Sequence, residues 1–76
     1  MYMYAKYVMT GTGPIIFPDS FRHEHFRLYH PTSAGHVIIE DDEVITFGDS
    51  FSLQMKSDKA DAEKIASAFG ILQTSE

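Results

Sequence analysis

Apolar and polar residues alternate between positions 36 and 56, and this pattern predicts three short strands joined by two tight turns. Asp41-Asp42 and Gly48-Asp49 are suited to those turns, because Asp and Gly tolerate the positive φ that two-residue hairpin loops require. Loops of this length set Ile39 opposite Val44 and Phe47 opposite Ser50. We therefore expect a three-stranded antiparallel ribbon with a defined register.

Successive side chains of a strand point to opposite faces, so this register sorts the ribbon residues into two sets. The set expected to face the core is Val37, Ile39, Val44, Thr46, Phe51, Leu53 and Met55. The other set combines apolar residues of the first two strands with polar residues of the third. Exposed apolar patches of this kind usually mark an interface. The candidate interface residues are His36, Ile38, Ile45 and Phe47.

The N-terminal half predicts a second hairpin. A strand over 4–10 is followed by a turn over 11–14 and by a short strand over 15–17, which we expect to return antiparallel to the first. Pro18 ends that strand, and a short helix is expected over 21–26. The segment 31–35 is expected to be a loop.

The clearest helical pattern follows position 57. Asp58 is a suitable N-cap, and a carboxylate at Asp61 is favoured in the positive first turn of a helix. The apolar stripe is Ala62, Ile65, Ala66 and Phe69, and we expect it to pack on Val44, Phe51 and Leu53. Gly70 is a suitable C-terminal cap, accompanied by Ile71.

These elements predict a single α+β domain over residues 1–76. It consists of a small antiparallel sheet of four to five short strands, with the C-terminal helix packed on one face and a short helix or turn after the second strand. A chain of 76 residues buries only about 60% of its unfolded surface and is marginally stable alone. Since the chain has no Cys to form disulfides, we expect it to gain buried area as a homo-oligomer.

The formal net charge of −5 disfavours general nucleic-acid binding, which needs clustered Lys and Arg. The sequence shows neither a signal peptide nor a run long enough for a membrane helix, so we expect a cytoplasmic protein without a membrane partner.

Positive and imidazole side chains concentrate between residues 22 and 30. Arg presents a donor fork to phosphate or carboxylate, and a neutral His donates one hydrogen bond. This segment and the loop after it therefore predict a site for a small anion. The candidate ligand-binding residues are Arg22, His23, His25, Arg27, His30, Ser33 and Gly35.

Other chemistry is weakly supported. Gly11-x-Gly13 lacks the third glycine of a dinucleotide fingerprint, and Gly48-x-Ser50 precedes a strand where a nucleophile elbow needs a helix. His23 and His25 could share a metal ion on a strand, but no Cys or carboxylate completes a recognisable spacing. We therefore expect no catalytic residues, no cofactor and no metal ligand.

Several short motifs resemble those of small, mostly uncharacterised proteins of phages and prophage-bearing bacteria. The matching motifs are Ser33-Ala-Gly35, Gly48-x-Ser50-x-Ser52-Leu53, Lys56-Ser57 and Asp61-Ala62. The chain departs from the pattern at His36, where an aromatic is expected, and at Asp58, where Arg is common. The resemblance implies a mobile-element origin, and a host cytoplasmic location if the chain is phage-encoded.

Many small acidic phage proteins counter host defence, so the resemblance favours a binding role over an enzymatic one. We expect a non-catalytic protein that sequesters a small anionic, nucleotide-like ligand as an oligomer. The alternatives are an inhibitor that binds a host protein complex and a histidine-based metal-binding protein.

Overall fold

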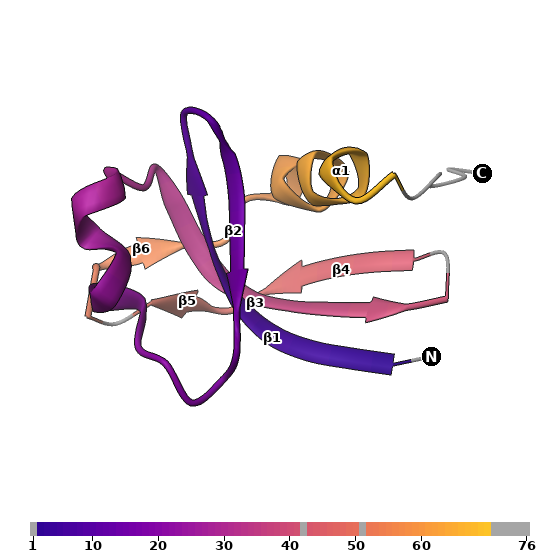
Figure 1. Cartoon of the computed structure of the whole chain (residues 1–76), viewed down its shortest axis with the longest axis horizontal. Coiled ribbons are helices and arrows are strands. Elements are labelled where there is room, and N and C mark those ends of the chain that lie inside the picture. The colour runs from indigo at the N-terminus through magenta and orange to yellow at the C-terminus, as the bar shows by residue number, and fades with distance from the viewer. Residues whose placement is uncertain (1, 42, 51, 71–76) are drawn as a thin grey trace.

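The computed structural model describes residues 2–41, 43–50 and 52–70, and within them it confirms the α+β class (Figure 1). A four-stranded antiparallel sheet packs against a C-terminal helix, and a second, two-stranded sheet lies beside it. The elements in chain order are β1 (Tyr2–Thr10), β2 (Gly13–Phe17), a 3-10 helix η1 (His23–Tyr29), β3 (Ser33–Glu40), β4 (Glu43–Phe47), β5 (Asp49–Ser50), β6 (Met55–Lys56) and α1 (Lys59–Ala68).

The large sheet has the strand order β2-β1-β3-β4, and every neighbouring pair is antiparallel. The predicted register of the β3–β4 hairpin is confirmed: Ile39 lies opposite Val44 and Glu40 lies opposite Glu43. The expected N-terminal hairpin forms as β1 and β2. The N-terminal strand β1 also pairs along the whole of β3, so it is a central strand of the sheet.

The third strand of the predicted ribbon does not form. The Gly48-Asp49 turn signal predicts that Ser50 lies opposite Phe47. In the structure, Ser50 instead pairs with Met55 in the β5–β6 hairpin. Gly48 adopts φ 75°, and the chain then passes close to β3 at Gly35, where a Cβ atom would lie 2.8 Å from the Phe47 carbonyl oxygen. Because Gly35 leaves this space open, the chain can cross β3 here without adding a strand to β4.

Two apolar clusters lie on opposite faces of the large sheet. The face that α1 covers, which we call the first face, holds Ala5, Tyr7, Met9, Val37, Val44, Ile65 and Ala66. The other, the second face, holds Val8, Phe17 and Ala34, with Phe26, Leu53 and Met55 packed against them. Leu53 and Met55 were expected on the side of α1, and this was wrong because the chain reverses within the β5–β6 hairpin. Phe51 lies outside the described residues.

The helix begins as predicted. Asp58 is the N-cap, and its side chain accepts a hydrogen bond from the Ala60 amide at 2.9 Å. Ile65 and Ala66 are buried in the expected stripe, but Phe69 is 50% exposed because the helix ends at Ala68. Ile71, expected beside the C-terminal cap, lies outside the described residues.

A buried carboxylate joins the helix to the sheet. Asp61 is only 1% exposed, and its Oδ2 atom accepts hydrogen bonds from the Tyr7 hydroxyl at 2.5 Å and the Ser33 hydroxyl at 2.7 Å. The same oxygen accepts from the Asp58 amide at 3.0 Å. Burial and the neighbouring carboxylate both raise the pKa of Tyr7, so its hydroxyl remains a donor at neutral pH.

We predict that Asp61→Ala lowers the free energy of unfolding by about 3 kcal/mol, because two buried hydroxyl groups lose their partner. Urea denaturation followed by circular dichroism measures the loss. Glu63→Ala is the matched control, since Glu63 is an exposed carboxylate in the same helix. Equal effects of the two substitutions would contradict the role given to Asp61.

Candidate functional site

A hollow of about 310 Å³ opens on the second face of the sheet, close to η1 and β5. We call it the histidine hollow, and the residues that line it are Lys6, Arg22, His23, His36, Asp49 and Ser52. Two cationic and two imidazole side chains therefore meet at one place on a chain whose net charge is −5. Figure 1 shows η1 and β5 toward one end of the molecule, with β1 and β3 running from that end to the other.

His23 is the most constrained of these side chains. It is 5% exposed, and its Nε2–H donates a hydrogen bond to the Gly35 carbonyl at 2.8 Å. Burial lowers the pKa of His23 below its ordinary value of 6.5; the bond to Gly35 opposes this, and Lys6 and His36 lower the pKa further. The ring is therefore neutral at pH 7, and because its N–H is donated to Gly35, its other nitrogen acts as a hydrogen-bond acceptor.

His36 is held by aromatic rings on both sides. Its Nδ1 atom is hydrogen-bonded to the Tyr4 hydroxyl at 2.8 Å. Its ring stacks on Tyr4 and Phe47, with centroid separations of 5.8 and 5.5 Å. These contacts fix the orientation of the imidazole, so the hollow has one wall that is already ordered.

The charged groups of the hollow are partly compensated. Lys6 Nζ donates to the Phe21 carbonyl at 3.0 Å and lies 3.9 Å from Asp19 Oδ1. Arg22 contacts Glu24 at 3.0 Å, but its side chain is 70% exposed and can turn toward a ligand. Asp49 contributes an acceptor, so the hollow suits a molecule that carries both an anionic group and a hydrogen-bond donor.

Of the seven expected ligand-binding residues, only Arg22 and His23 line this hollow. His25 Nδ1 accepts from the Arg22 amide at 3.1 Å and caps η1, and His30 is the left-handed C-cap at φ 54°. The Arg27 guanidinium does not line the hollow but donates to the carbonyl of Ser52, which does, at 3.0 Å.

Ser33 and Gly35 belong to β3, so the expected loop over 31–35 was wrong for these residues. Ser33 is bonded to Asp61 on the first face, whereas the Gly35 carbonyl accepts from His23 on the second. Pairing with β1 explains the correction, since Ser33 lies opposite Met9 in a ladder that the local sequence does not reveal.

The expected interface residues share the second face, as predicted. Ile45 is 43% exposed and Phe47 is 39% exposed, whereas Ile38 and His36 are half-buried. Tyr4, also on this face, is 40% exposed. These side chains adjoin the histidine hollow through His36 and Phe47.

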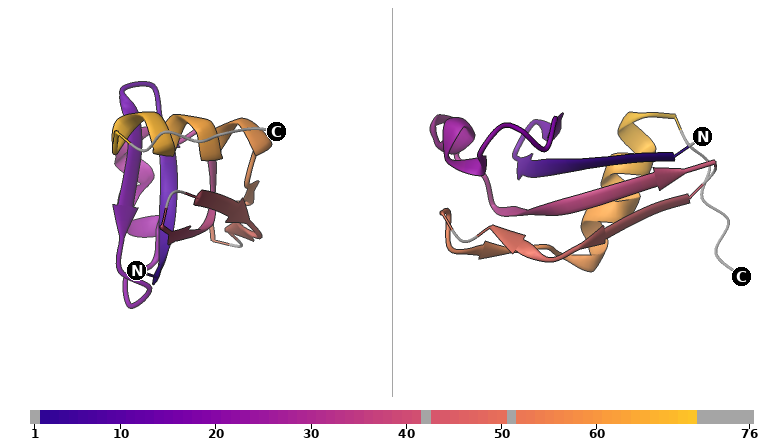
Figure 2. Two further views of the ribbon diagram at one scale, coloured as in Figure 1. Left: turned by 90° about the vertical axis from the view of Figure 1, so that its right-hand side faces the viewer. Right: turned by 90° about the horizontal axis from the view of Figure 1, so that it is seen from below.

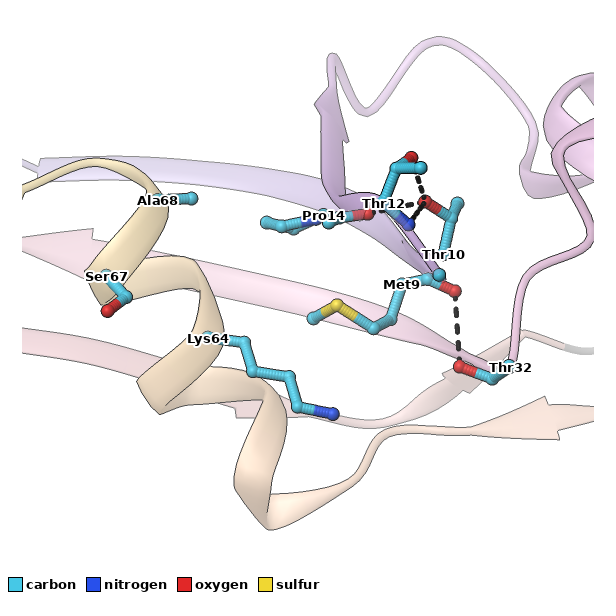
Figure 3. A pocket seen from close by; sticks show the side chains of 10 residues that line it. Met9, Thr10, Thr12, Pro14, Thr32, Lys64, Ser67 and Ala68 are labelled. Atoms are coloured by element: carbon cyan, nitrogen blue, oxygen red, sulfur yellow. Dashed lines mark hydrogen bonds between the residues drawn. The ribbon is translucent and has the colours of Figure 1, made fainter.

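A larger hollow of about 530 Å³ lies between the β1–β2 turn and α1 (Figure 3). Its hydroxyl groups are mostly occupied: Thr10 bonds Thr12 at 3.1 Å and the Gly13 carbonyl at 2.7 Å. Lys64 extends from α1 along this hollow and is the only cationic residue among those that line it. This arrangement offers fewer groups to an anion than the histidine hollow does.

The cluster of Tyr7, Ser33 and Asp61 resembles a catalytic set in composition alone. Tyr7 and Asp61 are almost fully buried, and both hydroxyls are committed to the carboxylate. The cluster thus leaves no position for a substrate and is structural. Among residues 2–41, 43–50 and 52–70, no three His or carboxylate side chains come together in a way that could hold a metal ion.

The chain matches no family model, no curated protein and no solved structure. No helix in the described part of the chain is long and apolar enough to cross a membrane.

We predict that stability falls as the pH drops below 6.5, because the unfolded chain binds a proton at His23 more readily than the folded protein does. One such group changes the free energy of unfolding by at most about 1.4 kcal/mol per pH unit. Urea denaturation at several pH values measures the slope. His23→Gln keeps a donor for the Gly35 carbonyl and should flatten the profile, whereas His30→Asn at an exposed cap should not. A slope unchanged by His23→Gln would contradict this assignment.

Proposed function

We propose that the protein is a non-catalytic binding protein that takes up a small anionic, nucleotide-like ligand in the histidine hollow. The observation that supports this most directly is the convergence of Lys6, Arg22, His23 and His36 on one open cavity. A phosphate group placed there meets two cations and can accept a hydrogen bond from the His36 ring, whose Nδ1 atom is bonded to the Tyr4 hydroxyl.

The remaining features of the hollow suit the rest of such a ligand. Asp49 and the hydroxyl of Ser52 can hydrogen-bond sugar hydroxyl or amino groups. The exposed faces of Phe47 and Tyr4 lie beside the hollow and can stack on a base. A nucleotide signal held in this way is withheld from its receptor, which is the counter-defence role that the resemblance to phage proteins favours.

Ligand binding should raise the melting temperature by mass action. We predict that nucleoside mono- and diphosphates raise it in a thermal-shift assay, and that Arg22→Ala removes most of the shift because the exposed guanidinium is lost. Lys59→Ala is the matched control: it removes the same charge from α1, which does not line the hollow, and should leave the shift intact.

The same assay includes zinc ions and inorganic phosphate as separate probes. A shift with zinc that a chelator reverses would favour the histidine-based metal alternative over nucleotide binding. Absence of a shift with every nucleotide and with phosphate would contradict the proposal.

A further inference from the structure

One end of the second face is left open by the described part of the chain. Helix η1 and the β5–β6 hairpin cover the end that contains Val8 and Ala34. Beyond them, β1, β3 and β4 present side chains that face away from α1. Tyr2 is 61% exposed, and Tyr4, Ile45 and Phe47 are each about 40% exposed.

The strand register arranges this open face in three rows that cross β1, β3 and β4. We define it by its nine residues: a first row of Lys6, His36 and Phe47, a middle row of Tyr4, Ile38 and Ile45, and a third row of Tyr2, Glu40 and Glu43. The first row carries a cation and an imidazole, the middle row is apolar, and the third row is acidic. Neighbouring rows are two residues, or about 7 Å, apart along each strand.

We propose that two copies of the chain pack open face to open face. The twofold axis that relates them lies between the two sheets and runs parallel to the middle row, directly over it. Such an axis reverses the order of the rows, so Glu40 lies over the partner's His36, beside the partner's Lys6. Ile38 and Ile45 then meet their own counterparts. The acidic third row of each copy then lies over the first row of its partner, which carries Lys6 and His36. Because the open face is complementary to itself in this way, a second copy of the chain is the partner that fits it.

The shape of the molecule permits this packing. Figures 1 and 2 show η1, β5 and β6 at one end of the sheet, and the start of β1, the end of β3 and the start of β4 at the other. Because the axis reverses the strand direction, the end of one copy that carries η1, β5 and β6 lies beyond the uncovered end of its partner. The two covered ends therefore do not collide. Helix α1 is on the first face and stays outside the interface. The result is a two-sheet sandwich, with helices on its outer sides.

Lys6 and His36 also line the histidine hollow, so a ligand there and the partner's Glu40 compete for them. The dimer therefore forms without a ligand, and sedimentation equilibrium of the free protein tests it. We expect a mass of about twice the 8.6 kDa of the chain. Ile45→Asp should weaken association at least about tenfold, because it introduces a charge in the apolar row. A free protein that stays monomeric at roughly 0.1 mM would overturn the proposal and leave the open face to a different protein.

A second variant covers the case in which Ile45→Asp fails to fold. Glu40→Lys removes the repulsion between Glu40 and Glu43 within the hairpin, so the monomer should become more stable. The same change sets a lysine beside the partner's Lys6, so the dissociation constant should rise by about tenfold. Glu63→Lys makes an equal change of charge on α1 and should leave the dissociation constant unaltered. A dissociation constant unaffected by Glu40→Lys would overturn the proposal.

Cysteine cross-linking tests the twofold geometry, since the chain has no Cys of its own. A mixture of Glu43→Cys and Phe47→Cys proteins should be joined by a short bismaleimide, because the axis brings these positions together. Either variant alone should react poorly, since like positions lie four residues, or about 13 Å, apart along the strands. Equal yields from Glu43→Cys alone, or none from the mixture, would overturn this arrangement.

Discussion

One buried carboxylate sets the position of the helix relative to the sheet. Asp61 accepts hydrogen bonds from β1, from β3 and from the residue that caps its own helix. A charge removed from water is costly unless all its partners are in place. Other positions of α1 along the sheet would leave this carboxylate or the Tyr7 hydroxyl without a partner. The interaction therefore favours a single packing of α1, in addition to the apolar contacts of Ile65 and Ala66.

The position of α1 has consequences on the opposite side of the sheet. The chain has one long helix among its described residues, and that helix covers the first face. Of the residues that the structure describes, only η1 and the short β5–β6 hairpin pack on the second face, and they cover one end of it. The histidine hollow forms where this cover meets the sheet, and the open face begins at the same boundary with His36. Both proposed binding surfaces thus arise because a chain of 76 residues has too few residues to cover both faces of its sheet.

Local signals in the sequence were sufficient for the β3–β4 register and for the Asp58 cap, since both depend on neighbouring residues. They failed at Gly48-Asp49, where the approach of the chain to Gly35 overrides the preference for a hairpin. The buried role of Asp61 was missed, although it precedes Ile65 by one helical turn and so shares its face. The hollow could not be predicted in full, because Lys6 and Asp49 are distant in sequence and meet only through sheet pairing.

A double-mutant cycle on Tyr7 and Asp61 tests the central claim most directly. Tyr7→Phe removes only the hydroxyl and Asp61→Ala removes the accepting carboxylate, so the cycle measures the hydrogen bond between them. A coupling free energy of about 1 to 3 kcal/mol is expected from urea denaturation of the four proteins. Effects that add to within about 0.3 kcal/mol would show that the carboxylate and the hydroxyl act independently, and would contradict the account of how the helix is held.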